Sequence, residues 1–120
     1  MGDTKAVQNK SRQFAVQIVT LYQNLCDAHH AYDLFRQILR CGTSIGANIA
    51  EAEYAISKKD FLSKMYISLK ECAETAYWLD LLHDTDYLTD ERHQSLAADC
   101  RELRKLLSSI TKTTSESLGA

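Results

Sequence analysis

Proline is absent from this 120-residue sequence, and only four glycines are present. Both residues interrupt helices, so a chain with so few of them is typical of long helices joined by short turns. The sequence also lacks a strong charge of either sign, because 14 Lys and Arg oppose 16 Asp and Glu for a formal net charge of −2. This balance excludes a polycation that binds nucleic acid by bulk charge, although it leaves room for a local basic patch.

Long apolar runs are also missing. No segment approaches the roughly 18 apolar residues that a membrane-spanning helix needs, and the polar N-terminal segment 1–12 lacks the apolar core of a signal peptide. We therefore expect a cytoplasmic protein with no membrane partner. An apolar content of 45% and a charged content of 25% are ordinary for a globular domain and exclude wholesale disorder.

Cysteine motifs are missing too. The four cysteines, Cys26, Cys41, Cys72 and Cys100, form no Cys-x-x-Cys pair, which excludes a zinc ribbon or a thioredoxin-like motif. We interpret all four as small buried thiols, because free cysteine is among the most frequently buried residue types.

Apolar residues recur with helical spacing in four segments, and we predict helices over about 5–28, 32–55, 58–83 and 90–111. Ser57 and Thr89 are the predicted N-caps of the third and fourth helices. The small polar segment 113–120 is expected to be a flexible tail. Four helices of similar length with short turns favour an all-α fold, a single antiparallel up-down-up-down four-helix bundle over 1–120.

Two features of the predicted helices indicate close packing. Gly42, Gly46 and Ala50 form a row of small residues on one helix face, where another backbone can approach. The stretch 76–82 is apolar nearly all round, as in a helix that is central in a large core or shared with a neighbouring molecule. A bundle of this size encloses no helix fully, so we expect an oligomer contact at Tyr77, Trp78 and Leu81.

The histidines fall at one end of the predicted bundle. His29, His30, His83 and His93 share this end, with Cys26, Asp84 and Asp86 nearby. One interpretation is a zinc site, since imidazole with thiolate or carboxylate suits that metal. The other is that the first three lie near helix C-termini, where the helix dipole stabilises a cation. We favour the second and predict no metal site and no cofactor.

Polar residues also lie within the second predicted helix. Ser44, Asn48 and Glu51 share a face, and Glu74 of the third helix could meet them. One interpretation of Glu51 and Glu74 is an acid–base pair, but no nucleophile elbow, phosphate loop or metal motif accompanies them. We therefore predict a structural polar network, no catalytic residue and no enzyme activity.

Basic residues are distributed over three of the predicted helices and form no single stripe in one chain. An oligomer could gather them into a surface that binds RNA or DNA through phosphates. The candidate nucleic-acid-binding residues are Arg36, Arg40, Lys58, Lys59, Arg101, Arg104 and Lys105.

Three sequence segments are similar to segments of a known protein family. They are RCGTSIGANIAEA over 40–52, SKKDF over 57–61 and LKECAETAYWL over 69–79. Together they resemble the bacterial four helix bundle protein family, which includes proteins encoded by intervening sequences in large-subunit ribosomal RNA genes. The match covers about residues 12–110 and implies an up-down bundle that assembles as a homopentamer, a ring with a central channel. More distantly, the chain is similar to the accessory proteins of diversity-generating retroelements, which are also pentameric and work with a reverse transcriptase and its RNA.

The resemblance places the family's signature residues on Ser44, Asn48, Glu51 and Glu74, with Arg40 as a basic companion. Relatives often carry arginines where this chain has Ala73, Ala76 and Asp80, so a basic channel is less well supported in this member. The first functional hypothesis is a non-enzymatic homopentamer that binds RNA or DNA. The alternative is an adaptor ring that docks a partner protein such as a reverse transcriptase, with Tyr54 or Trp78 exposed at its rim.

Overall fold

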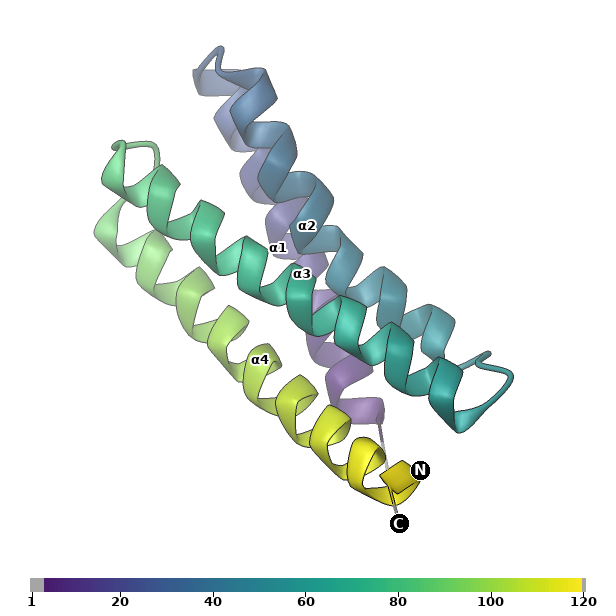
Figure 1. Ribbon diagram of the computed structural model, residues 1–120. Coiled ribbons are helices and arrows are strands. Elements are labelled where there is room, and N and C mark those ends of the chain that lie inside the picture. Colours follow the sequence, from purple (N-terminus) through teal and green to yellow (C-terminus); the bar gives the residue numbers. More distant parts are fainter. Residues whose placement is uncertain (1–3, 120) are drawn as a thin grey trace.

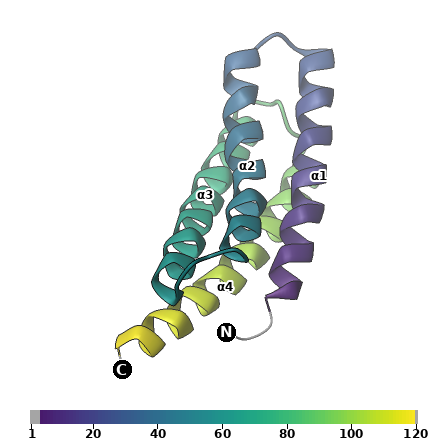
Figure 2. The same cartoon turned by 90° about the vertical axis from the view of Figure 1, so that its right-hand side faces the viewer.

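The computed structural model describes residues 4–119, and this range contains four helices and no strand. They are α1 (Lys5–Ala28), α2 (Tyr32–Ala52), α3 (Lys58–Asp84) and α4 (Asp90–Gly119). Successive helices pack side by side in up-down order, whereas α4 touches α1 only lightly. The α1–α2 hairpin leans across the α3–α4 hairpin in an elongated molecule of 50 × 22 × 20 Å (Figures 1 and 2). The prediction of an all-α, four-helix fold is confirmed.

The predicted N-caps are present. The Asp60 backbone N–H donates to Ser57 Oγ at 3.0 Å, and the Arg92 N–H donates to Thr89 Oγ1 at 3.2 Å. The Asp60 carboxylate accepts from the Ile56 N–H at 3.1 Å, one residue before the cap. These bonds satisfy amides that have no partner within the helix, which is why α3 and α4 begin where they do.

The predicted ends of two helices were wrong. α4 continues to Gly119, so the segment expected to be a flexible tail is helical as far as the structure describes it, and Ala120 lies outside that range. Thr111 and Thr114 are buried, and the Thr111 hydroxyl donates to the Leu107 carbonyl at 2.9 Å. Because this bond satisfies the hydroxyl, the Thr111 side chain can be buried within the helix in place of an apolar one. α2 instead stops early, at Ala52, because the Glu53 N–H turns back to the Ala50 and Glu51 carbonyls.

The core lies between the two hairpins and draws on all four helices. Ser68 is fully buried in it, and its hydroxyl donates to the Ile45 carbonyl at 2.8 Å, which ties α3 to α2. The largest fully buried side chains are Phe14, Phe35, Ile18, Leu21, Ile38, Ile45, Ile49, Met65, Leu79, Leu82, Leu103 and Leu107.

No described helix has the length and apolarity needed to cross a membrane.

The row of small residues on α2 has the packing role that its spacing indicates. A Cβ atom added at Gly42 would lie 2.9 Å from both Cγ1 and Cγ2 of the buried Ile18 on α1. At Gly46 it would lie 3.3 Å from Ser11 Oγ and 3.4 Å from the Ser11 carbonyl oxygen. Glycine at these positions therefore lets α1 and α2 approach each other closely.

Gly42→Ala should destabilise the protein by about 1–2 kcal/mol. Overpacking against the stiff, β-branched Ile18 costs about 1–3 kcal/mol, and the higher helix propensity of alanine offsets up to about 1 kcal/mol of that. Urea unfolding at a fixed protein concentration measures the difference. Gly46→Ala is the matched control and should be close to neutral, because its new contacts are longer. Equal stability of Gly42→Ala and the unmodified protein would contradict this packing account.

Candidate nucleic-acid interface

Three of the predicted nucleic-acid-binding residues already have protein partners. Arg36 pairs with Asp33 at 2.5 Å. Arg40 bridges α2 and α3 by pairing with Glu74 and, at 3.5 Å, with Glu71. Lys58 Nζ donates to Ser117 Oγ at 2.7 Å. A phosphate would have to compete with acids at Arg36 and Arg40, and with a hydroxyl at Lys58.

The remaining four, Lys59, Arg101, Arg104 and Lys105, are exposed and form no ion pair within residues 4–119. The last three share one face of α4 with the exposed Lys112, given their positions along a helix. Two acidic residues of the same helix point elsewhere, since Asp99 and Glu102 line a cleft toward α1, where Glu102 pairs with Lys10 at 2.7 Å. The exposed Glu116 follows Lys112 by one helical turn at the far end of this face. We call Arg101, Arg104, Lys105 and Lys112 the α4 basic face.

Charge is also distributed unevenly along the molecule. The end that holds the α1–α2 and α3–α4 turns is the acidic end, with Arg36 and Arg92 as its basic exceptions. Its acids are Asp27, Asp33, Asp84, Asp86, Asp90 and Glu91. The opposite end combines the start of α3 with the last turns of α4 (Figure 1). It carries Lys58, Lys59, Lys64 and Lys112 against Glu51, Glu53, Asp60 and Glu116, so it is close to neutral. A polyanion is therefore repelled less at this second end than at the acidic end, and we call the second end the basic end.

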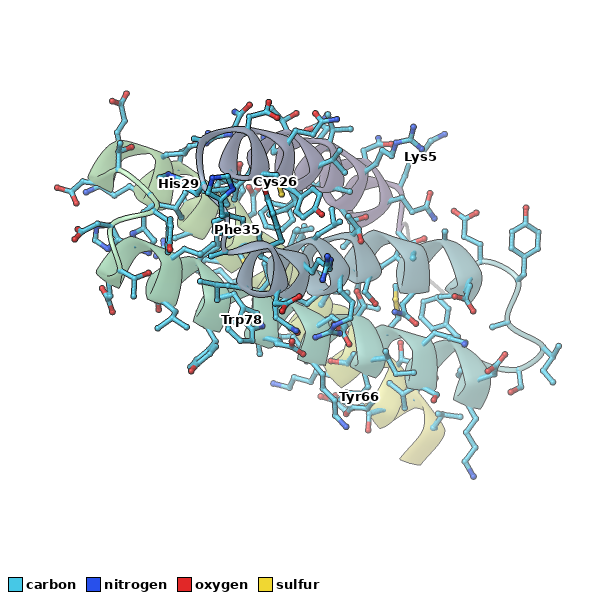
Figure 3. The ribbon with its side chains drawn as sticks, turned by 90° about the horizontal axis from the view of Figure 1, so that it is seen from above. Lys5, Cys26, His29, Phe35, Tyr66 and Trp78 are labelled. Carbon is cyan, nitrogen blue, oxygen red and sulfur yellow. The ribbon has the colours of Figure 1, made fainter. Side chains whose placement is uncertain are left out.

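Two aromatic side chains of α3, Tyr66 and Tyr77, are exposed to solvent. Tyr77 is 60% exposed, and Tyr66 lies on the outward side of the same helix, as Figure 3 shows together with Trp78. Trp78 is half-buried, packs edge-to-face on Tyr77 with ring centroids 5.1 Å apart, and donates from Nε1 to Glu74 at 3.0 Å. We define Ile67, Tyr77 and Leu81 as the α3 stripe, because helical spacing places them on one line of the helix. Ile67 and Tyr77 are exposed, Leu81 is half-buried, and the charged Lys70 and Glu74 lie between them on this line.

The four signature polar residues form separate contacts. Asn48 Nδ2 donates to the Ser44 carbonyl at 2.9 Å and to Ser44 Oγ at 3.0 Å. Glu51 pairs with Lys64 at 3.1 Å, while Glu74 pairs with Arg40. On α3, Lys64 (the partner of Glu51) and Glu74 are ten positions apart, which is about 15 Å along a helix. Glu51 and Glu74 therefore do not face each other as an acid–base pair would.

The histidines lie at the acidic end but are used for packing and pairing. His83 Nε2 contacts Asp90 at 2.6 Å and His93 Nε2 contacts Asp80 at 2.8 Å, so each α3–α4 pair crosses between the helices. The two imidazoles stack with centroids 4.2 Å apart. His29 packs edge-to-face on Phe35 and on Tyr87. Figure 3 shows His29 beside Phe35. No group of three or more His, Cys, Asp or Glu side chains in the described range is arranged to hold a metal.

The hydrogen bond to Asp90 raises the pKa of the His83 imidazole above 6.5, with smaller contributions from the Asp90, Asp84 and Asp80 charges and an opposing effect of desolvation. Asp90→Asn should therefore lower this pKa toward 6.5, as measured by an NMR titration of the imidazole. Because the folded-state pKa is raised, the stabilisation is fully present below the unfolded pKa of about 6.5 and is lost as the pH rises through the folded pKa.

Asp86→Asn is the matched control for this titration. Asp86 is exposed in the same turn and has a φ of 67°, which asparagine also tolerates. It should leave the pKa of His83 unchanged. Equal effects of the two substitutions would show that the net charge of the turn, and not the hydrogen bond, controls His83.

An apolar groove runs along the outer side of α1 and α2. It has a volume of about 650 Å³ and is lined mainly by small and aliphatic side chains, of which Val16 is 57% exposed. We define the α1/α2 groove by Ala15, Val16, Val19, Ala47 and Ala50. This groove was not predicted from the sequence, although Val16 and Val19, which lie beside the buried Ile18, were a signal. Lys112 was not among the predicted site residues either, because the predicted fourth helix ended at about residue 111.

Comparison with known proteins agrees with this architecture. The model of a family described as 23S rRNA-intervening sequence protein matches residues 3–109. A solved structure from Bacteroides thetaiotaomicron, described as a protein of unknown function from the S23 ribosomal protein family, is 51% identical and superposes with a TM-score of 0.84. The match covers 88% of this chain and 98% of that one. No curated protein matches the sequence.

Proposed function

Because the chain belongs to the 23S rRNA-intervening sequence protein family, we propose that it is a non-enzymatic, self-assembling bundle that binds structured RNA through the α4 basic face. The observation that carries this proposal is the set of exposed cations on α4 that have no acidic partner in the described range. We place its action in the cytoplasm, where ribosomal RNA is found.

Binding at the α4 basic face would rely on phosphates. Unpaired guanidinium and ammonium groups can contact phosphate oxygens without breaking an existing ion pair, and release of counterions from the RNA then drives association. Double-stranded RNA is recognised largely by its shape and its phosphates. Lys59 and Lys112 would extend the contact toward the basic end, whereas Arg36 and Arg40 would take no part, because acids already neutralise them.

Self-assembly would use two different apolar surfaces of the same chain. The α1/α2 groove is concave and lined by small residues, while the α3 stripe projects Ile67 and Tyr77 outward. We propose that the α3 stripe of one copy docks in the α1/α2 groove of the next. Such a head-to-tail contact between unlike surfaces generates a closed ring when the rotation between copies closes. Together with the resemblance to pentameric bundles, this supports a homopentamer.

The absence of enzyme activity is supported by the separation of Glu51 from Glu74. Each carboxylate is paired with a basic side chain of the neighbouring helix, Lys64 for Glu51 and Arg40 for Glu74. Two carboxyl groups that act as an acid–base pair must both reach the same substrate, and Glu51 and Glu74 are too far apart along the helices to do so.

A second candidate function is a protein adaptor. Tyr54 and Ile56 in the α2–α3 turn are 85% and 93% exposed, and exposed tyrosines often anchor protein interfaces. In this alternative the ring docks a partner protein through this turn and does not bind RNA.

A gel-shift experiment with the purified native oligomer separates the two candidates. The probes are a labelled RNA hairpin and a DNA duplex of the same sequence at low salt. Micromolar binding of the hairpin supports the proposal, and equal binding of the duplex would extend it to DNA. No shift of either probe would contradict it and favour the adaptor.

A further inference from the structure

Two buried thiols meet at the interface of α3 and α4. The sulfur atoms of Cys72 and Cys100 are 3.6 Å apart, and each side chain also reaches the other residue's carbonyl oxygen, at 3.2 Å for Cys72 and 3.4 Å for Cys100. The two residues are 1% and 2% exposed. No other pair of thiols in residues 4–119 forms such a contact.

A small pocket gives access to this pair from the side of the α4 basic face. Its volume is about 160 Å³, and it is lined by Cys72, Cys100, Ala76, Ala97, Asp80, Arg101 and Arg104. The two alanines leave space beside the sulfurs, and Arg101 and Arg104 against the acid Asp80 give the described lining a net positive charge. A molecule as small as a hydroperoxide fits this space.

The two thiols differ in chemical character. The hydrogen bond from Cys100 lowers the pKa of Cys72 against the opposing effect of burial, and the Arg104 charge acts in the same direction. The same hydrogen bond, with burial, raises the pKa of Cys100. Cys72 is thus suited to be the thiolate, the nucleophilic form, while Cys100 remains a thiol. Cys41 has no such partner, and burial raises its pKa to about 11.

We propose that Cys72 and Cys100 form a redox-active dithiol that a small hydroperoxide converts to a disulfide linking α3 to α4. The Cys72 thiolate attacks one peroxide oxygen, the O–O bond breaks, and the departing hydroxide takes a proton to become water. Cys72 is then a sulfenic acid. The Cys100 sulfur attacks the Cys72 sulfur, the S–O bond breaks and a second water leaves. In total, two thiols and one hydrogen peroxide give one disulfide and two waters.

The reverse step requires a thiol reductant, which is oxidised as the disulfide opens. The cross-link would lie directly beneath Arg101 and Arg104 and would prevent α3 and α4 from separating there. The inference rests on the sulfur geometry and the pocket, and it does not depend on RNA binding.

Peptide mapping tests the proposal on the folded, reduced protein. The protein is treated with a small excess of hydrogen peroxide, unfolded in N-ethylmaleimide and digested without reductant. The expected product is a single Cys72–Cys100 linked peptide pair, lighter by about 2 Da than the two thiol peptides, with Cys26 and Cys41 alkylated. Dithiothreitol should restore both thiols. Oxidation that spares this pair, or that first links Cys26 between chains, would overturn the proposal.

Two variants assign the roles of the sulfurs. Cys100→Ser should trap Cys72 as a sulfenic acid that dimedone labels, because the second thiol is gone. Cys41→Ser is the matched control and should form the disulfide as the unmodified protein does. Labelling of Cys41 or Cys26 in place of Cys72 would contradict the assignment. If Cys100→Ser does not fold, the linked peptide in the unmodified protein still decides whether the pair reacts.

Discussion

Replacing Arg101, Arg104 and Lys105 together with alanine should weaken RNA binding about 100-fold, because each lost charge-assisted contact is worth about 1 kcal/mol or more. The three side chains are exposed and form no ion pair in the described range, so their loss should leave the fold intact. The slope of log Kd against log salt should fall by about two to three units, since each phosphate contact contributes just under one unit. Fluorescence anisotropy with a labelled RNA hairpin measures both quantities.

The matched control removes three other cations. Lys10, Arg36 and Arg92 lie away from the α4 basic face and outside the α1/α2 groove, and Lys10 faces Glu102 between α1 and α4. Their replacement with alanine changes the net charge by the same amount. This variant should bind RNA within a few-fold of the unmodified protein. Equal losses in the two variants would mean that RNA responds to net charge and not to the α4 basic face.

Replacing Ala47 and Ala50 with glutamate should convert the assembly to monomers. Both alanines are exposed in the single chain and line the α1/α2 groove. Glutamate is a good helix former, so each chain should still fold. If the groove holds the α3 stripe of a second copy, two further carboxylates would be buried there beside Glu53, with Arg12 as the one cation that the described residues contribute to the lining, at a cost of several kcal/mol. Light scattering during size exclusion should then report the 13.6-kDa chain in place of a particle about five times heavier.

Ala6→Glu with Ala98→Glu is the control for the assembly experiment. Both positions are exposed on helices and lie outside the α1/α2 groove. The double substitution adds the same charge and should leave the particle mass unchanged. A glutamate variant of Ala47 and Ala50 that keeps the full mass would show that the groove is not the contact between copies.

Much of the fold could be predicted because periodic apolar residues and cap residues act locally. Phe14, Ile18 and Leu21 recur with helical spacing, and Ser57 bonds an amide three residues away. The end of α4 could not be predicted in the same way. Its last turns bury Thr111 and Thr114 in place of apolar side chains, so the pattern on which the prediction depended fades before the helix ends.

The candidate site was harder to predict because it depends on the register between helices. Composition alone treats Arg40 and Arg101 alike, yet Arg40 is held by Glu74 and Glu71, whereas Arg101 has no acidic partner in the described range. The contact of Cys72 with Cys100 joins residues 28 positions apart and follows from how α3 and α4 align. The same alignment sets Glu51 apart from Glu74, although both were expected in one network.

The most direct test of RNA binding is a salt titration of the unmodified oligomer with a labelled, structured RNA between about 50 and 200 mM salt. A surface that contacts several phosphates should show micromolar binding at low salt, and the affinity should collapse over this range. This result would establish the chain as a phosphate-binding protein. Absence of binding at the lowest salt, or binding that does not change with salt, would contradict the proposed function.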